Sequence, residues 1–341
     1  MTRPQRISYV LMAAMLLLVG WLYMTTLLLS TLFCFLSLQI LSFGRNKLLA
    51  VVLVSLLLGA AGWGFYHFAK QAWKTFPALA ESTIPKITDF AEKQQIELPF
   101  TDLASLKAEA LNKVQSVSSH IGVFVRTAVF QLVYLIIGFV VATSLFFDSR
   151  FRVEGDPHTM SENLYTLTGH ELSLRFKNFF HSFAIVMGAQ LLISTVNTIL
   201  TAIFLFSVGF QHATILVIFT FLCGLLPILG NIISNTVITA VGFTISPNMA
   251  VVALAFLILI HKLEYFLNSK IIGHRIKNPM WLTLLGLLLG EKLMGIPGMI
   301  LAPVILHYIK VEASQAKMHE GDTDRSVGSD PERAAAGPGA R

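Results

Sequence analysis

An uncharged stretch of the chain, residues 178–261, constrains the fold more than any other feature. It contains no Arg, Lys, Asp or Glu, so it is expected to lie in a bilayer, where backbone polar groups must be satisfied within helices. Pro227 and Gly230 interrupt this stretch. Proline removes a backbone donor and clashes with the preceding turn, and glycine lets the chain leave helical geometry. The pair therefore predicts either a kink or the tip of a re-entrant hairpin.

The length around this interruption favours the hairpin or broken helix over the kink. From Gln211 to Pro247 the chain advances 36 residues (247 − 211), which is about 54 Å of helix at about 1.5 Å per residue. A bilayer core is only about 30 Å thick. One span does not fit this length, and irregular backbone at membrane depth must be buried in protein or face a watery cavity.

Composition sets the class of protein. Hydrophobic residues make up 55% of the chain and charged residues 13%, where soluble proteins have about 25% charged residues. We predict an all-α polytopic membrane protein with about seven or eight transmembrane helices, additional re-entrant or broken helices, and an amphipathic helical extramembrane segment. The net charge of +6 lies in short segments between apolar runs, as in cytoplasmic loops, so no nucleic-acid partner is expected. The two cysteines fall in apolar segments and support neither disulfides nor a metal site.

The chain divides into segments of different character. The basic residues between apolar runs predict that both termini are cytoplasmic, and the N-terminal run has the character of an uncleaved anchor. Two short spans are expected within 7–44, joined near 25–31. Pro77, Pro85 and Pro99 are expected to divide the amphipathic segment into short helices, whose apolar face over 103–125 needs a partner within or between subunits. A capping box at Thr159 and Glu162 predicts a helix start at Met160. The predicted segments are 1–69 (N-terminal transmembrane helices), 70–121 (amphipathic and extracytoplasmic), 122–147 (transmembrane), 148–182 (cytoplasmic turn and interfacial helix), 183–310 (a core with two helix breakers) and 311–341 (a disordered cytoplasmic tail).

Polar side chains form stripes on three of the core helices. Spacings of three and four residues place the members of each stripe on one helical face. Such stripes often only hold membrane helices together; beside a helix break, they also build substrate sites in many transporters. Both interpretations stay open for each residue. The stripes are Gln190, Ser194, Asn197 and Thr201; Asn231, Asn235 and Thr239; and His261, Glu264 and Asn268.

Glu264 is the acidic residue of these stripes. It either reaches the interface beside Lys262, or it is the one acidic group positioned to carry a proton or bind a cation. No His-Glu-x-x-His pattern and no phosphate-binding glycine loop with lysine occurs in the chain. The sequence therefore predicts neither an enzyme nor an ATP-driven pump, and no cofactor or resident metal.

Several motifs together resemble one family of bacterial permeases. They are Leu-Pro-Ile-Leu-Gly at 226–230, Glu264, Lys-Ile-Ile-Gly at 270–273, Pro279, and Gly-Ile-Pro-Gly-Met-Ile-Leu-Ala-Pro at 295–303. This combination resembles the autoinducer-2 exporter (AI-2E) family. Asn231 and Ser269 replace prolines that many members carry, so the motifs predict the family but not the substrate.

The resemblance implies a multi-pass transporter of the bacterial inner membrane that forms a homo-oligomer, by family likeness a pentamer. Some members are linked to export of the quorum-sensing signal autoinducer-2, and others to sodium or lithium efflux against protons. The predicted substrate pathway takes members of the polar stripes together with both breakers. It consists of Gln190, Ser194, Asn197, Thr201, Pro227, Gly230, Asn231, Asn235, Glu264, Asn268, Gly295, Pro297 and Gly298.

Three functional hypotheses follow. The first is a permease or exporter of a small polar organic solute, favoured because the stripes consist of neutral amides and hydroxyls. The second is a Na⁺(Li⁺)/H⁺ antiporter, which needs a buried carboxylate that only Glu264 supplies. The third is a non-transporting membrane scaffold that uses the amphipathic segment. The expected partners are the lipid bilayer, a small molecule or ion, and further copies of the chain.

Overall fold

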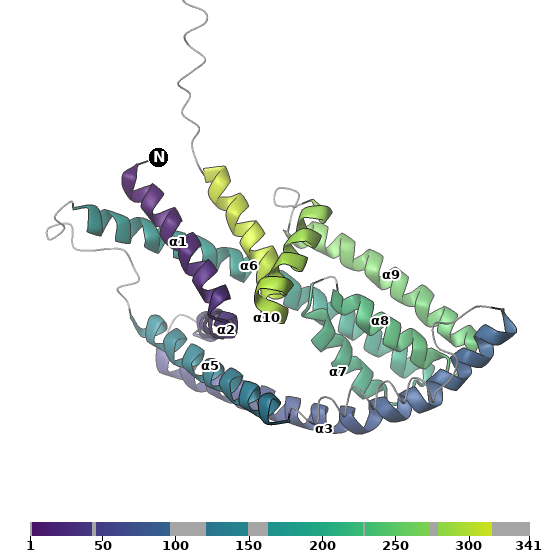
Figure 1. The fold of residues 1–341 in the computed structure, drawn as a ribbon. Helices are drawn as coiled ribbons and strands as arrows, with labels where there is room; N and C mark the ends of the chain where they lie inside the picture. The colour runs from purple at the N-terminus through teal and green to yellow at the C-terminus, as the bar shows by residue number, and fades with distance from the viewer. Residues whose placement is uncertain are drawn as a thin grey trace, which may run out of the picture.

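The computed structural model describes residues 2–42, 46–95, 121–148, 163–227, 229–272 and 279–315, and the side chains of 121–128, 265–272 and 280 lie outside this description. The described ranges are helical, which confirms the all-α prediction (Figure 1). The helices are α1 (Arg3–Trp21), α2 (Thr25–Leu41), α3 (Lys47–Lys93), α5 (Ile121–Phe147), α6 (Leu164–Val208), α7 (Ala213–Gly224), α8 (Leu229–Gly242), α9 (Pro247–Ile272) and α10 (Met280–Gln315).

Six helices in the described ranges are long and apolar enough to cross a membrane: α1, α3, α5, α6, α9 and α10. Helix α2 has 17 residues, which is the lower limit for a spanning helix of about 17–25 residues. Large apolar side chains such as Trp63 and Val140 are exposed on these helices, as expected of surfaces that face lipid. The protein is therefore a polytopic helical membrane protein.

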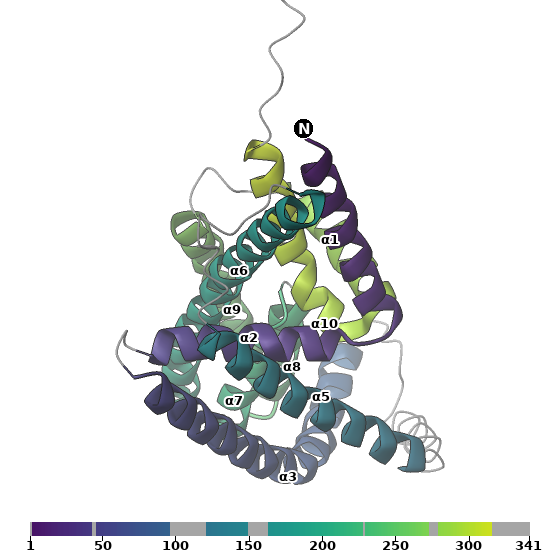
Figure 2. The ribbon, with the colours of Figure 1, turned by 90° about the vertical axis from the view of Figure 1, so that its left-hand side faces the viewer.

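The turn between α1 and α2 comes a few residues earlier in the chain than the sequence predicted. The turn occupies residues 22–24, with Tyr23 in the left-handed region at φ 56°, whereas the expected junction at 25–31 is already helical. Helix α2 then packs along α5, which is distant in sequence (Figure 2). Gly138 of α5 permits this close approach, because a Cβ there would overlap Ser30.

Helix α3 corrects a second prediction. Pro77 and Pro85 lie inside this single helix of 47 residues and do not divide it into short helices. A proline inside a helix bends it when neighbouring elements support the freed backbone, and α3 curves around α7 and α8 (Figure 1). Lys86 extends from α3 and donates a hydrogen bond to the carbonyl of Thr244 beyond the end of α8. Pro99 and most of the predicted apolar face at 103–125 lie outside the described residues.

Helix α6 is the central element, since it contacts α1, α2, α7, α9 and α10. Its 45 residues run without a break through the predicted junction between interfacial and spanning helix at 182. Asn163 caps the start of the helix by accepting a hydrogen bond from the Thr166 amide at 2.9 Å, and Gly209 ends it with φ 76°. The predicted capping box at 159–162 lies outside the described residues.

Candidate functional site

The chain breaks its helix at Pro227, as predicted. Helices α7 and α8 have 12 and 14 residues, about 18 and 21 Å, and each is therefore shorter than a bilayer core of about 30 Å. They pack against each other as a hairpin, so a single kinked helix is excluded. Gly230 allows the tight return, because a Cβ on it would overlap the carbonyl of Cys223.

Two residues of the α6 stripe bind the broken end of α7. The last carbonyls of a helix have no partner within the helix. Gln190 donates from Nε2 to the Gly224 carbonyl at 2.6 Å, and Ser194 donates from Oγ to the Phe221 carbonyl at 3.1 Å. These side chains therefore satisfy backbone groups that the break exposes. Thr201 of the same stripe is buried in α6.

A second group of polar residues gathers around Glu264, where α6, α8 and α9 meet. Asn231 donates from Nδ2 to the Glu264 carboxylate, and the Asn197 side chain interacts with the same carboxyl group. His261 places Nδ1 3.7 Å from Glu264 Oε2. The Glu264 side chain is only 14% exposed, so it points into the helix bundle and not to the interface beside Lys262. Asn197 is buried, and its Oδ1 has no hydrogen-bond partner within the described part of the chain.

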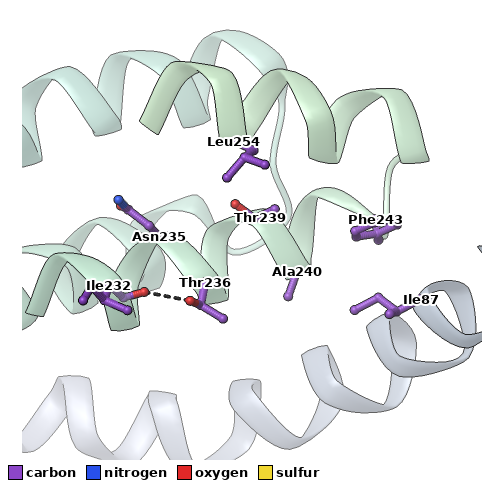
Figure 3. A pocket seen from close by; sticks show the side chains of 8 residues that line it. All are labelled: Ile87, Ile232, Asn235, Thr236, Thr239, Ala240, Phe243 and Leu254. Carbon is purple, nitrogen blue, oxygen red and sulfur yellow. Dashed lines mark hydrogen bonds between the residues drawn. The ribbon is translucent and has the colours of Figure 1, made fainter. Parts of the chain in front are cut away.

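The α8 stripe leads from this cluster into a cavity of about 410 Å³ between α3, α8 and α9 (Figure 3). Asn231, Asn235 and Thr239 lie at intervals of four residues, so the stripe extends about 12 Å along α8. Thr236 also lines the cavity, but its hydroxyl donates to the Ile232 carbonyl at 2.8 Å. The lining residues are Ile87, Ile232, Asn235, Thr236, Thr239, Ala240, Phe243 and Leu254.

Helix α10 contains the second break. Gly295 has φ 64° and ψ −153°, a conformation that side-chain-bearing residues rarely adopt. The two halves of α10 fold onto each other. Gly290 and Gly298 are so close that a Cβ on Gly298 would overlap the Gly290 carbonyl. The α10 hairpin, as we call this folded helix, confirms the predicted break and explains why small residues stand on both sides of it.

The two hairpins point toward each other from opposite ends of the molecule (Figure 1). Helix α9 begins directly after α8 and runs for 26 residues, or about 39 Å. Helix α10 begins only eight residues after α9 ends (280 − 272). The open end of the α10 hairpin therefore lies far from the open end of the α7–α8 hairpin.

The register of the second half of α10 on α6 indicates that both tips lie near the same part of α6. The second half of α10 runs antiparallel to α6, with the ring of Tyr308 5.6 Å from that of Phe179 and with Leu301 in the same buried cluster as Met187. Continuing this register by about one turn of 3.6 residues brings residues 295–298 beside Gln190, the residue that binds the end of α7.

A buried ion network at the base of the α10 hairpin was not predicted from the sequence. Arg175 of α6 lies 2.5 Å from Glu312 of α10 and 2.9 Å from Glu171. Tyr9 of α1 and Asn178 of α6 each donate a hydrogen bond of 2.9 Å to Glu312. Arg175 and Glu312 are only 8% and 5% exposed. The sequence placed Glu312 in a polar tail, although its spacing from the buried residues Leu301, Val304 and Tyr308 continues one helical face.

The remaining predicted residues are placed as follows. The backbone of Asn268 belongs to α9, and its side chain lies outside the part of the chain that the structure describes. Asn235 and Asn197 occupy different places, the first in the cavity and the second at Glu264. Pro297 belongs to the tip of the α10 hairpin.

Two comparisons with known proteins indicate the family to which this chain belongs. Over 141 residues the chain is 31% identical to "Putative transport protein YdbI" of Bacillus subtilis (strain 168). This match covers 41% of the chain and 40% of the relative, so it spans about two fifths of the relative's length. The model of the AI-2E transporter family matches residues 7–316. The chain therefore belongs to the AI-2E transporter family, which confirms the resemblance found in the sequence, and family and relative indicate a transport protein rather than an enzyme.

Proposed function

We propose that this protein moves a small polar organic solute through the bacterial inner membrane, with both termini in the cytoplasm. The observation that carries the proposal is the continuous stripe of Asn231, Asn235 and Thr239, which joins the α8 cavity to the Glu264 cluster. Amides and hydroxyls both donate and accept hydrogen bonds, as a hydroxylated ligand requires. The cavity of about 410 Å³ lies within the usual range of about 300–1,000 Å³ for small-molecule sites. Autoinducer-2, a solute linked to some family members, has this chemistry.

In this proposal both hairpins are re-entrant and enter the bilayer from opposite faces. Short helices that end near the midplane expose backbone groups to a solute, as in many secondary transporters. The α7–α8 hairpin bounds the outer half of the pathway and the α10 hairpin bounds the inner half. The exposed apolar surfaces of α3 and α5 are available to lipid and to further copies of the chain in a homo-oligomer.

A second function, Na⁺(Li⁺)/H⁺ antiport, is favoured by the surroundings of Glu264. A carboxylate with two asparagine side chains from α6 and α8 beside it combines a titratable group with neutral oxygen ligands, as coupled cation exchange requires. Membership of a transporter family argues against the third hypothesis, a scaffold without transport.

Flux into proteoliposomes tests the proposal. Labelled polyols and sugars and ²²Na⁺ serve as probes, and flux is normalised to folded protein. Asn235→Leu and Thr239→Val should each reduce apparent affinity for the transported polyol or sugar by about three- to thirtyfold, the loss of one hydrogen bond. Thr236→Val is the matched control, because this hydroxyl in the same cavity already binds a backbone carbonyl, and it should transport like the parent.

The same measurement separates the two transport functions. If parent and all three variants transport the polyols and sugars equally, the cavity is not on the pathway. Glu264→Gln should leave most neutral-solute flux intact. Loss of a pH-dependent ²²Na⁺ flux in this variant would instead establish antiport.

A further inference from the structure

Helix α1 lies along the α10 hairpin from its base to its tip (Figure 2). Near the start of α1, Tyr9 donates a hydrogen bond to Glu312 at the base. At the other end, a Cβ on Gly20 would lie 2.6 Å from Cε of Met294 beside the tip. Met12, between these two points, is buried in one cluster with Leu301 and Tyr308. The second half of α10 thus lies against α1 and α6 at its base and in its middle, and α1 also reaches Met294 beside the tip.

Glu312 is the residue at which these three helices are joined. Its Oε2 accepts hydrogen bonds from Tyr9 of α1 and from Arg175 of α6, and its Oε1 accepts one from Asn178 of α6. The guanidinium of Arg175 also lies 4.2 Å from the centre of the Tyr9 ring. A buried carboxylate is tolerated only when such partners compensate its desolvation, and their geometry then allows few alternative positions.

We propose that Glu312 is a positioning residue for transport. It fixes the base of the α10 hairpin to α6 and α1 and so holds residues 295–298 beside Gln190, opposite the α7–α8 break. Arg175 and Tyr9 act through Glu312. The role of the tip in transport rests on the proposed function, whereas the positioning rests on the contacts at the base.

The shape of α10 explains why its base controls its tip. Glu312 lies 17 residues beyond Gly295 (312 − 295), about 26 Å along the helix. A tilt of about 5° at the base would therefore move the tip by about 2 Å. Pro303 lies between base and tip and removes one backbone hydrogen bond, so the second half of α10 depends on its neighbours for its direction.

Cross-linking between α1 and the tip tests this role in the full-length protein, reconstituted in liposomes. Cys34 and Cys223 are replaced by alanine, and Gly20→Cys and Met294→Cys introduce a reporter pair for a short bis-maleimide. The Met294 replacement also removes the side chain that a cysteine at position 20 would otherwise meet. Glu312→Gln should lower the cross-linking rate by about tenfold, because it weakens charge-assisted hydrogen bonds. Glu291→Gln changes an exposed carboxylate of the same helix and should leave the rate unchanged.

Tyr9→Phe provides a second test in case Glu312→Gln does not fold. It removes one hydroxyl and keeps the ring beside Arg175, so cross-linking should slow by about threefold. Thermal melts and gel filtration identify folded variants. A folded Glu312→Gln or Tyr9→Phe protein that cross-links at the parent rate overturns the proposal.

Flux of the polyol and sugar probes in the same vesicles separates this proposal from the proposed function. Slower cross-linking together with reduced flux supports the positioning role in transport. Slower cross-linking with unchanged flux shows that Glu312 sets the tip but overturns its role in transport. If the parent transports none of the polyols and sugars but the cross-linking difference persists, the proposed function fails and the positioning stands.

Discussion

The α7–α8 hairpin and the α10 hairpin each interrupt a helix, but different contacts stabilise them. The α7–α8 hairpin is bound at its break, where Gln190 and Ser194 of α6 donate to the freed carbonyls of α7. The α10 hairpin is bound at its base by the ion pair of Arg175 and Glu312, and its tip is closed by contact between Gly290 and Gly298.

This difference shows that a break need not be stabilised where it occurs. Neutral hydrogen bonds in membrane proteins are each worth about 0.6 kcal/mol on average, so the α7–α8 break can lose one and remain folded. Breaking a buried ion pair leaves an uncompensated charge and costs about 3–5 kcal/mol. The α10 hairpin should therefore depend far more on a single side chain than the α7–α8 hairpin does.

The largest effect is expected from Arg175→Ala. This change leaves Glu312 buried without its cationic partner, so the free energy of unfolding should fall by about 3–5 kcal/mol. Chemical denaturation in detergent micelles, followed by circular dichroism, measures the loss. Lys177→Ala removes an exposed charge from the same helix and should change stability by no more than about 0.5 kcal/mol. If the two variants were equally stable, the Arg175–Glu312 ion pair at the base would not stabilise the α10 hairpin.

A smaller effect is expected at the tip of the α10 hairpin. Gly298→Ala places a Cβ against the Gly290 carbonyl and should cost about 1–3 kcal/mol through overpacking. Gly62→Ala in α3 is the control, because no atom of another helix in the described ranges lies within 4 Å of its added Cβ. Thermal melts of both variants provide the comparison, and a Gly298→Ala protein as stable as Gly62→Ala would show that the two halves of α10 are not in contact.

The smallest effect is expected at the α7–α8 break. Gln190→Leu leaves the Gly224 carbonyl without its donor and should cost about 0.6–1 kcal/mol. Thr195→Ala removes a hydroxyl that donates within its own helix, to the Leu191 carbonyl, and should be nearly neutral. Denaturation midpoints of the two variants provide the test. A loss larger than that of Arg175→Ala would reverse the proposed difference between the hairpins.

Much of the fold was predictable because its signals are local. Pro227 and Gly295 change the backbone at their own positions, and the stripe of Asn231, Asn235 and Thr239 follows helical spacing. Pro77 and Pro85 were misjudged because their effect depends on neighbours: α3 remains one helix as it curves along α7 and α8.

The ion network could not be predicted for a different reason. Arg175 and Glu312 are 137 residues apart, and each stands among other charged or polar residues in the sequence. Only the packing of α10 against α6 shows that these two side chains are buried while Lys177 is exposed. Likewise, periodicity grouped Gln190 with Asn197, but tertiary packing directs the first to a backbone carbonyl and the second to Glu264.

The central claim is that the solute pathway follows the stripe on α8. Single cysteines at 231, 235 and 239, with Ile233 and Val237 as controls on other faces, can be labelled with an impermeant thiol reagent from the side opposite the termini. Labelling should be rapid at 239, slower at 235 and slowest at 231, and weak at both controls, since a thiol in hydrocarbon does not form the reactive thiolate. Equal labelling at all five positions, or labelling at the controls alone, would contradict a pathway along this stripe.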